Sequence, residues 1–365
     1  MDNYKNMLAI IGSLSNLFSD SDKPMIYYRA HENCFCKYFD ADNLSRHDCS
    51  ADARKNSIGI GLKTWVGSNN QKIAEFGKLR KELNALDDEK LIYKVSNLRN
   101  ERIKTTMNMY GIKEMIYHIL LRDENLMTIK ECPFEFIDID NLKRIPEKDG
   151  ANTCYFTDGK NIYNFNKAKT TLYMIFDKLI HMDEIPVNII DDPFDLLEKK
   201  NDVYTKLLSN KTKKNPVLCL KLYSENNKGY FVPQKSGLNQ WNASGRKRNP
   251  NEIYIPFPSK DRNRIENKKF FPPKDTKFTL ILPDGTTLSA KICQQDGKAI
   301  MSNPNKDLGK WLLRDVLELK EKELIDYNLL QQKGFDAVIF EKIAELTYTI
   351  NFTDSKVYDD LYDND

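Results

Sequence analysis

The sequence predicts two domains of different fold class: an α+β N-terminal domain with an α/β core, and a mostly β C-terminal domain that forms a pseudobarrel. The length of 365 residues is more than one hydrophobic core usually serves. Helix-like and strand-like segments are mixed up to residue 209, whereas short strands separated by turn signals fill residues 217–352. Residues 210–216 are polar and basic and carry no periodicity, so we expect a linker there.

The expected domains are residues 1–209 and 215–352, followed by an acidic tail at residues 353–365. A composition of 40% hydrophobic and 30% charged residues excludes collagen-like and wholly disordered chains. No apolar run reaches the roughly 18 residues that span a bilayer, and the first residues do not resemble a secretion signal. We therefore expect no membrane association and a cytoplasmic location.

In the N-terminal domain, hydrophobic spacing predicts several helices, one early hairpin and a later group of strands. The helices are expected at residues 2–18, 30–39, 68–83, 87–110 and 170–208, and the strands at residues 114–121, 127–131 and 153–165. The hairpin, residues 50–66, has alternating apolar residues and Asn56-Ser57 at its turn. The helix at 68–83 is predicted because Ser68 and Gln71 have the spacing of a capping box.

In the C-terminal domain, short apolar runs alternate with turn signals, as in small closed or half-closed barrels. Strands are expected at residues 217–223, 229–232, 252–256, 277–282, 286–293 and 346–352, and helices at residues 307–317 and 327–333. Asp284-Gly285 is typical of a tight hairpin turn.

Cysteine and histidine patterns argue against a disulfide framework and against a zinc site. The seven cysteines are odd in number and include no CxxC pair, and the four histidines are scattered.

The distribution of charge along the chain is more informative about function. Residues 206–275 contain sixteen Lys and Arg against five Asp and Glu, a local net charge of +11 in a chain whose total is +3. Such a concentrated basic segment is typical of polyanion binding.

The predicted hairpin carries a first candidate site. Period-two alternation turns Gly59, Gly61 and Lys63 to the face opposite the apolar residues. With the turn at Asn56-Ser57, Asp52 lies across from Gly61 and projects from the same face as Lys63. The glycines are expected to leave that face open to a phosphate or a metal ion.

An acid and a lysine at such a position suit phosphodiester hydrolysis, in which carboxylates hold Mg²⁺ and a lysine orients the attacking water. We expect Asp52 and Glu75 to hold the metal, Lys63 to position the water, and Glu32 on the preceding helix to assist. Glu75 is expected inside the helix at 68–83, pointing at the hairpin. Asp48 is an alternative to Asp52.

Two polar stretches of the C-terminal domain, residues 235–256 and 297–311, carry side chains that can read DNA. Their DNA-binding candidates lie at residues 235–251, called the first arm below, and at residues 302–310, called the second arm. Arg, Asn and Gln have forked donors and acceptors that match base edges in the major groove. Asp307 is expected to cap a helix whose start favours phosphate. The DNA-binding candidates are Lys235, Asn239, Trp241, Asn242, Arg246, Lys247, Arg248 and Asn251 in the first arm, and Ser302, Asn303, Asn305, Lys306 and Lys310 in the second.

The Asp52 to Lys63 hairpin with its nearby acids resembles the catalytic core of the PD-(D/E)xK nucleases. The string Ser-Ala-Asp-Ala at residues 50–53, followed by Gly-Ile-Gly-Leu-Lys-Thr-Trp at residues 59–65, is also similar to the N-terminal segment of some restriction endonucleases. The chain departs from the family at Gly61, where the usual acid two residues before the lysine is missing. The resemblance implies that Glu75 replaces it.

Residues 215–352 resemble the plant B3-like recognition domain of certain type II restriction endonucleases. The likeness rests on Leu-Asn-Gln-Trp-Asn-Ala-Ser-Gly-Arg-Lys-Arg at residues 238–248 and on Met-Ser-Asn-Pro-Asn-Lys-Asp-Leu-Gly-Lys-Trp-Leu at residues 301–312. It implies that both arms enter the major groove. Some relatives join this domain to a phospholipase-D-type nuclease with HxK motifs, and this sequence has no such motif.

Together these features predict a type II restriction endonuclease that cleaves double-stranded DNA with Mg²⁺, and the family resemblance implies that it leaves 5′-phosphates. Cutting both strands requires two active sites or two encounters, so we expect a homodimer, at least on DNA. One alternative is a sequence- or modification-specific DNA-binding protein without catalytic activity. Another is a nuclease that senses modified bases.

Overall fold

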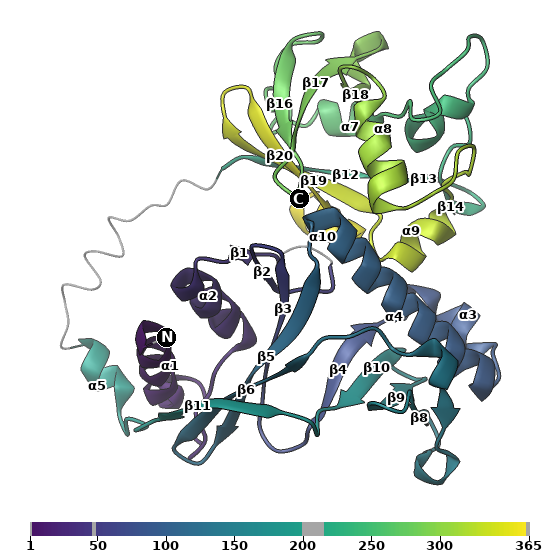
Figure 1. The fold of residues 1–365 in the computed structure, drawn as a ribbon. Helices are drawn as coiled ribbons and strands as arrows, with labels where there is room; N and C mark the ends of the chain where they lie inside the picture. Colours follow the sequence, from purple (N-terminus) through teal and green to yellow (C-terminus); the bar gives the residue numbers. More distant parts are fainter. Residues whose placement is uncertain (1, 46–48, 199–214, 363–365) are drawn as a thin grey trace. The chain divides into compact units, whose positions relative to one another are not determined.

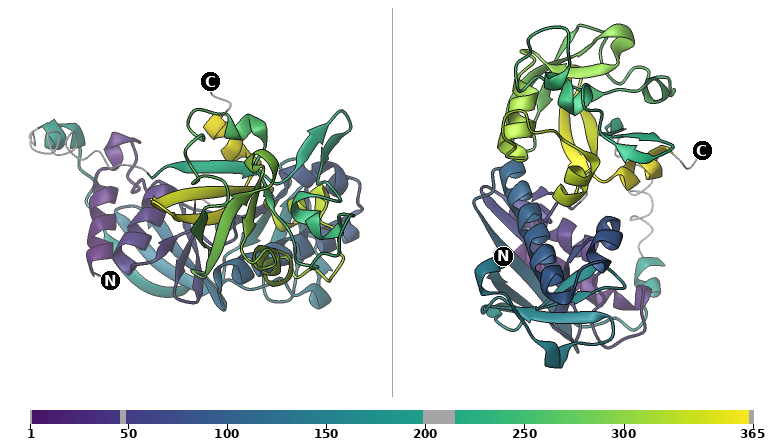
Figure 2. Two further views of the ribbon diagram at one scale, coloured as in Figure 1. Left: turned by 90° about the horizontal axis from the view of Figure 1, so that it is seen from above. Right: turned by 90° about the vertical axis from the view of Figure 1, so that its right-hand side faces the viewer.

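The computed structural model describes residues 2–45, 49–198 and 215–362. Its internal contacts divide the chain into two compact units. Of the described residues, 2–45, 50–103 and 112–198 form the N-terminal unit, and 49, 104–111 and 215–362 form the C-terminal unit. Figures 1 and 2 show the sheets of each unit with the helices that cover them. Within these ranges, no helix has both the length and the apolar composition needed to cross a bilayer.

The main sheet of the N-terminal unit has six strands in the order β1-β2-β3-β5-β6-β11. Its strands are β1 (Asp42–Asn43), β2 (Ala53–Lys55), β3 (Ile58–Trp65), β5 (Glu114–Asp123), β6 (Leu126–Pro133) and β11 (Ile180–Pro186). The expected hairpin is confirmed: β2 and β3 pair antiparallel with Ala53 opposite Ile60. Helix α4 (Asp88–Tyr110) then crosses over to β5, which pairs parallel to β3 with Leu62 opposite His118.

Helices cover this sheet on both faces (Figure 1). α1 (Asp2–Ser13) and α2 (Tyr28–Phe39) share one apolar core with Ile60 and Leu62 of β3. α4 packs on the opposite face, where Arg99 donates to the Tyr117 hydroxyl at 3.3 Å and to the Glu135 carbonyl at 2.9 Å. The sheet is therefore covered by α1 and α2 on one face, whereas Arg99 of α4 contacts Tyr117 on the other.

A buried polar network joins the helices to the sheet. The Tyr4 hydroxyl of α1 lies 2.9 Å from Nε2 of His31 on α2 and 3.1 Å from Nε2 of His118 on β5. His118 Nδ1 in turn lies 2.9 Å from Glu131 Oε1. Burial lowers the pKa of His31 to about 3, helped by the nearby His118, so this imidazole stays neutral.

The second sheet of the unit has the order β4-β10-β9-β8-β7, and two helices expected from the sequence are wrong here. Its strands are β4 (Asn70–Glu75), β10 (Thr171–Ile175), β9 (Ile162–Asn166), β8 (Thr153–Thr157) and β7 (Lys143–Arg144). Residues 68–83 form β4, η2 (Gly77–Leu79) and α3 (Arg80–Asn84), because β4 pairs antiparallel with β10. Residues 170–198 form β10 and β11 and end in a short helix, α5 (Pro193–Glu198).

Short 3₁₀ turns complete the unit. They are η1 (Ser15–Leu17), η3 (Ile139–Asn141) and η4 (Pro146–Lys148).

The C-terminal unit is built on one seven-stranded sheet in the order β12-β19-β20-β16-β17-β18-β15, which curls into a half-barrel. Its strands are β12 (Val217–Lys221), β19 (Ala337–Ala344), β20 (Thr347–Thr353), β16 (Lys277–Ile281), β17 (Thr287–Cys293), β18 (Ala299–Ser302) and β15 (Ile255–Pro256). A small hairpin, β13 (Ser224–Asn226) with β14 (Gly229–Phe231), stands apart from it. The expected barrel-like, mostly β region is thus present, and β19 is a strand that the sequence analysis missed.

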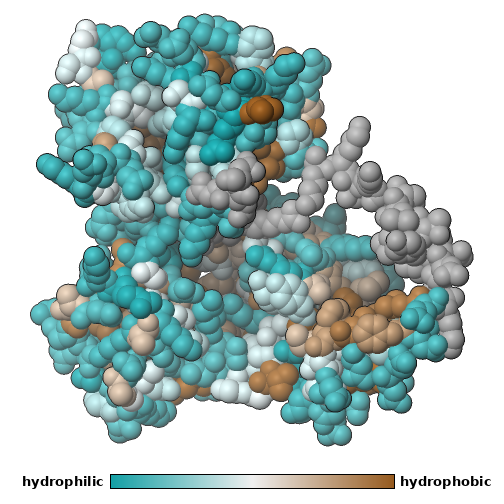
Figure 3. Space-filling view, turned by 180° about the vertical axis from the view of Figure 1, so that it is seen from behind, coloured by the Kyte–Doolittle hydropathy of each residue, from teal (hydrophilic) through white to brown (hydrophobic). Residues whose placement is uncertain are grey.

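Helices close the half-barrel, and the last of them replaces part of the expected acidic tail. They are η5 (Gly237–Asn242), α7 (Ser259–Arg262), η6 (Gln295–Gly297), α8 (Asp307–Gly309), η7 (Lys310–Val316), α9 (Tyr327–Lys333) and α10 (Ser355–Tyr362). In α10, Tyr358 and Tyr362 are buried in one cluster with Cys219 of β12. The face drawn in Figure 3 is mostly hydrophilic, with apolar residues in separate patches.

Candidate active site and nucleic-acid interface

Asp52 stands immediately before β2, where the pairing of the hairpin ends. Its backbone N–H donates to the Ile60 carbonyl at 2.9 Å, and its carboxylate accepts the Leu62 N–H at 2.8 Å. The side chain therefore replaces a backbone partner of β3, which fixes the carboxylate against the strand that carries Lys63. The predicted juxtaposition of Asp52 and the lysine strand is present.

Glu32 belongs to the same cluster. It projects from α2 with an exposed fraction of only 4%, and Arg29 pairs with it at 2.9 Å. Burial raises the pKa of Glu32, and the negative charge of Asp52 raises it further. Burial also raises the pKa of Asp52, an effect that the positive charge of Lys63 and the Leu62 N–H oppose. Two carboxylates that repel each other thus lie beside one lysine and one arginine.

The face of β3 that carries Gly59 and Gly61 is closed, contrary to the expectation from the sequence. A Cβ at Gly61 would lie 2.8 Å from Cδ1 of Tyr117 and 3.0 Å from Cδ1 of Phe134. These two rings stack at 4.1 Å with planes 6° apart. The glycine is required because neighbouring aromatic rings occupy the volume of a side chain, and an acid at this position would have no room.

The structure does not bring Glu75 into the cluster. Glu75 ends β4 in the other sheet, more than half of its side chain is exposed, and its carboxylate pairs with Lys72 at 3.2 Å. The charges that shift the pKa of Asp52 come from Lys63 and Arg29. Asp48, the alternative to Asp52, lies outside the described residues.

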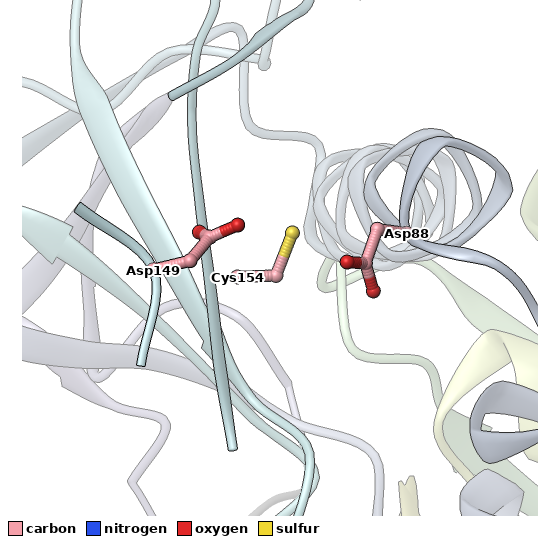
Figure 4. A group of neighbouring side chains, drawn as sticks. All are labelled: Asp88, Asp149 and Cys154. Carbon is pink, nitrogen blue, oxygen red and sulfur yellow. The ribbon is translucent and has the colours of Figure 1, made fainter. Parts of the chain in front are cut away.

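A second group of potential metal ligands lies elsewhere in the N-terminal unit. Ligand atoms of Asp88, Asp149 and Cys154 all lie within 4.8 Å of one another (Figure 4). Arg144 already pairs with Asp88 at 2.5 Å and with Asp149 at 2.8 Å, and Lys167 pairs with Asp88 at 2.5 Å. Burial raises the pKa of the Cys154 thiol to about 11, so it stays protonated at neutral pH. The two cations neutralise this group, which links α4 to the second sheet.

In the first arm, exposed and structural residues are interleaved. Lys235, Asn242, Arg246 and Lys247 are exposed. Asn242 donates to the Gln234 carbonyl at 3.0 Å, and Arg246 pairs with the buried Glu252 at 2.5 Å while 55% of its side chain stays exposed. These four side chains lie at the surface, where a DNA backbone or base edge can reach them.

Three other candidates of the first arm hold the arm together. Asn239 is fully buried, donates to the Ile325 carbonyl at 2.8 Å and accepts the Ile325 N–H at 3.0 Å. Arg248 donates to the Ala243 carbonyl at 2.6 Å and is 12% exposed. Asn251 accepts from Arg314 at 2.8 Å. We leave these three out of the proposed DNA-facing surface because each side chain already makes a hydrogen bond within the protein.

Trp241 is partly buried, in keeping with the expectation that it offers a flat apolar surface or packs the arm. It lines a cavity of about 400 Å³ together with Arg248 and Leu324.

The second arm leads into α8, and its buried start differs from the expected one. Ser302 is 3% exposed and its hydroxyl accepts the Leu308 N–H at 2.9 Å, so Ser302 rather than Asp307 satisfies the start of this helix. Lys306 and Lys310 are exposed, and Asn303 and Asn305 are partly exposed. These four remain candidates for DNA contact.

The two arms pack directly on each other. A Cβ at Gly309 of α8 would lie 1.9 Å from the Asn251 carbonyl oxygen, so only glycine permits this approach. Arg314 spans the same junction by donating to the Pro250 carbonyl at 3.0 Å as well as to Asn251. The sequence analysis missed Arg314 and also Arg29, although Arg29 stands three residues before Glu32 on one helix face.

Comparison with known families bears on the C-terminal unit. Residues 207–344 match the family model of the NgoFVII C-terminal B3-like DNA-binding domain. No curated protein matches the chain. The curled half-barrel of the C-terminal unit is consistent with a B3-like domain. The match therefore supports a restriction enzyme whose C-terminal region is a B3-like DNA-binding domain.

Proposed function

We propose that the protein is a type II restriction endonuclease that cleaves double-stranded DNA with Mg²⁺ and leaves 5′-phosphates. The observation that carries the proposal is the buried Glu32 carboxylate, whose pKa the charge of the partly buried Asp52 raises, together with Asp52 beside Lys63 on one hairpin. The B3-like DNA-binding match in the same chain supplies the expected substrate.

The residues present fit a divalent cation. Mg²⁺ is commonly held by one or two protein carboxylates together with phosphate oxygens of the substrate. Asp52 and Glu32 offer such a pair: burial and the negative charge of Asp52 both raise the pKa of Glu32, and a bound cation would favour the ionised form of both carboxylates. Glu75, which we expected as the second ligand, is replaced by Glu32 in this proposal because Glu75 is exposed and paired with Lys72.

In this proposal Lys63 and Arg29 have separate roles beside the bound metal ion. When bound, the metal ion would polarise the phosphoryl oxygen and lower the pKa of water. Lys63 would orient the attacking water and offset the negative charge that develops on the phosphate. Arg29 holds the Glu32 carboxylate in place through its 2.9 Å ion pair.

Recognition is assigned to the exposed side chains of the two arms. Lysines such as Lys247, Lys306 and Lys310 would contact phosphates and set the register, while Arg246, Asn303 and Asn305 would reach base edges. Cleavage of both strands requires two active sites or two successive encounters, and we propose that the protein acts as a homodimer on DNA.

A supercoiled-plasmid assay with Mg²⁺ or EDTA tests the proposal. The wild type should nick and linearise the plasmid only with Mg²⁺, and Asp52→Ala, Lys63→Ala and Glu32→Gln should each lose about 10²-fold or more in rate. Lys81→Ala, which removes an exposed lysine of α3, is the matched control for Lys63→Ala. Glu32→Gln should cost more than Glu75→Gln, and the reverse order would return the second ligand to β4.

If the wild type binds duplex DNA but never cleaves it, the protein is instead a DNA-binding protein without catalytic activity. The absence of an acid at Gly61 is the observation that favours this second function. Cleavage by the Asp52→Ala and Lys63→Ala variants at the wild-type rate would show that the active site lies elsewhere.

A further inference from the structure

A basic groove lies in the C-terminal unit, away from the two arms. Its cavity measures about 860 Å³. Five cationic side chains line it against only two acids, Asp296 and Glu345. The cations are Arg262, Lys268, Lys269, Lys274 and Lys342.

The groove and the second arm lie at opposite ends of the same strands. β18 begins at Ala299, two residues after the groove residue Gly297, and ends at Ser302, where the second arm begins. β17 runs antiparallel to β18, and its last residue, Cys293, follows the groove residue Ile292. A ligand in the groove therefore lies at the other end of β18 from the second arm.

Among the described residues, none of the five lining cations forms an ion pair with a carboxylate, whereas other cations close to them in the sequence do. Lys291 pairs with Asp275 at 3.0 Å and Arg264 approaches Asp261 at 3.9 Å, so these two acids are engaged by cations outside the groove and Asp296 and Glu345 are the acids that line it. Lys268, Lys269 and Lys274 are exposed. The groove consequently has an excess of positive charge that the unit does not neutralise.

The groove also has an apolar, aromatic lining. Phe271, which is partly exposed, packs against Phe278 at 5.3 Å and Tyr348 at 5.0 Å between ring centroids, so its position is fixed by the core. Two prolines and Leu346 extend the apolar surface. Bases of a single strand stack on such surfaces while lysines follow the phosphates, whereas the stacked bases of a duplex do not expose their faces.

We propose that this groove binds a single-stranded segment of nucleic acid, separately from the duplex that the arms contact. Phosphates would lie along Lys268, Lys269 and Lys274, and a base would lie against Phe271. The proposal does not depend on the cleavage activity proposed above, because no residue of the N-terminal unit takes part.

The test is fluorescence anisotropy on the full chain with a labelled oligothymidylate of about eight nucleotides, in EDTA so that cleavage cannot interfere. Lys268→Glu combined with Lys269→Glu should weaken binding at least tenfold, and Phe271→Leu should weaken it with little change in its salt dependence. The matched control reverses two exposed lysines outside the groove and the arms, Lys228→Glu with Lys356→Glu, and should change affinity less than twofold.

Duplex DNA supplies the second readout. A duplex added to the oligothymidylate complex should leave the oligothymidylate bound, and Lys306→Ala with Lys310→Ala should weaken duplex binding alone. The proposal is overturned if the groove variants bind oligothymidylate like the wild type, or if duplex displaces it competitively. Circular dichroism and thermal unfolding of each variant establish that a loss of binding is not a loss of folding.

Discussion

The closed face at Gly61 gives a sharp prediction, because it concerns the position where the nuclease pattern expected from the sequence lacks its acid. In Gly61→Ala the new methyl group would meet the Tyr117 ring at 2.8 Å, closer than carbon atoms approach in folded proteins. The ring cannot turn aside freely, since it stacks on Phe134 and its hydroxyl accepts from Arg99. The substitution must therefore strain the contact between β3 and β5.

The size of the effect follows from two opposing contributions. Overpacking a core by one methyl group costs about 1 to 3 kcal/mol, and replacing a strand glycine by alanine returns about 0.5 to 1 kcal/mol through the unfolded state. The two ranges leave a net loss of about 0 to 2.5 kcal/mol. Because a contact of 2.8 Å requires the ring to shift, we expect the upper part of this range, about 1 to 2.5 kcal/mol, or about 2 to 10 °C in the unfolding midpoint of a unit of this size. Differential scanning calorimetry of the full chain measures it.

Gly77→Ala is the matched control, because a Cβ there would lie 4.0 Å from its nearest neighbours. It should keep or slightly raise the midpoint. Gly61→Asp, which restores the family's usual acid, should lower the midpoint more than Gly61→Ala and should not increase cleavage, because the carboxylate enters an apolar stack. Equal midpoints for Gly61→Ala and Gly77→Ala would refute the argument that aromatic packing excludes the acid.

Three further predictions concern charge and the arms. Burial holds the pKa of Asp52 in the folded protein above its unfolded value, so the ionised carboxylate costs stability at neutral pH, and this cost disappears as the pH falls through the folded pKa. Asp52→Asn should therefore raise the unfolding midpoint near neutral pH and change it little below about pH 4. An equal shift of the midpoint at both pH values would contradict this. Arg248→Ala should lower the unfolding midpoint of the C-terminal unit, because it leaves the buried Glu252 and the Ala243 carbonyl with fewer partners. Lys247→Ala should keep the midpoint, but in a plot of the logarithm of the binding constant against the logarithm of the salt concentration its slope should be smaller by about one. Binding titrations at several salt concentrations separate the two variants. Gly309→Ala should weaken duplex binding without removing any DNA contact, because it forces α8 away from the Asn251 carbonyl, and a gel shift that matches the wild type would count against the coupling of the arms.

The sequence predicted correctly those helices and strands whose hydrophobic residues follow the spacing typical of that element. The hairpin around Asn56-Ser57, the long helix α4 and the strands β5 and β6 lie within a few residues of the expected positions. Residues 70–75 have a helical start signal and are nevertheless a strand, because pairing with β10 a hundred residues later decides their conformation. Such distant pairing leaves no mark in the local sequence.

The candidate site was predictable where two neighbours in sequence are also neighbours in space. Asp52 and Lys63 belong to one hairpin, so period-two alternation placed them together. The position of Glu32 depends on how α2 packs on that hairpin, and the position of Glu75 depends on the exit of the chain into a second sheet. Both positions depend on tertiary packing, which the local sequence does not show. For this reason the sequence predicts Glu75 as a metal ligand and Glu32 only as an assisting residue.

The arms illustrate why a recognisable motif does not by itself identify contact residues. Asn239, Arg248 and Asn251 have side chains suited to base edges, yet each is engaged with the protein's own backbone or with Arg314. A loop that reads DNA must be rigid before it binds, since ordering a loop on binding reduces affinity. Polar motif residues therefore serve two purposes: buried ones fix the backbone, and exposed ones such as Arg246 and Lys306 meet the ligand. Substitutions of the first kind should lower stability and affinity together, and substitutions of the second kind should lower affinity alone.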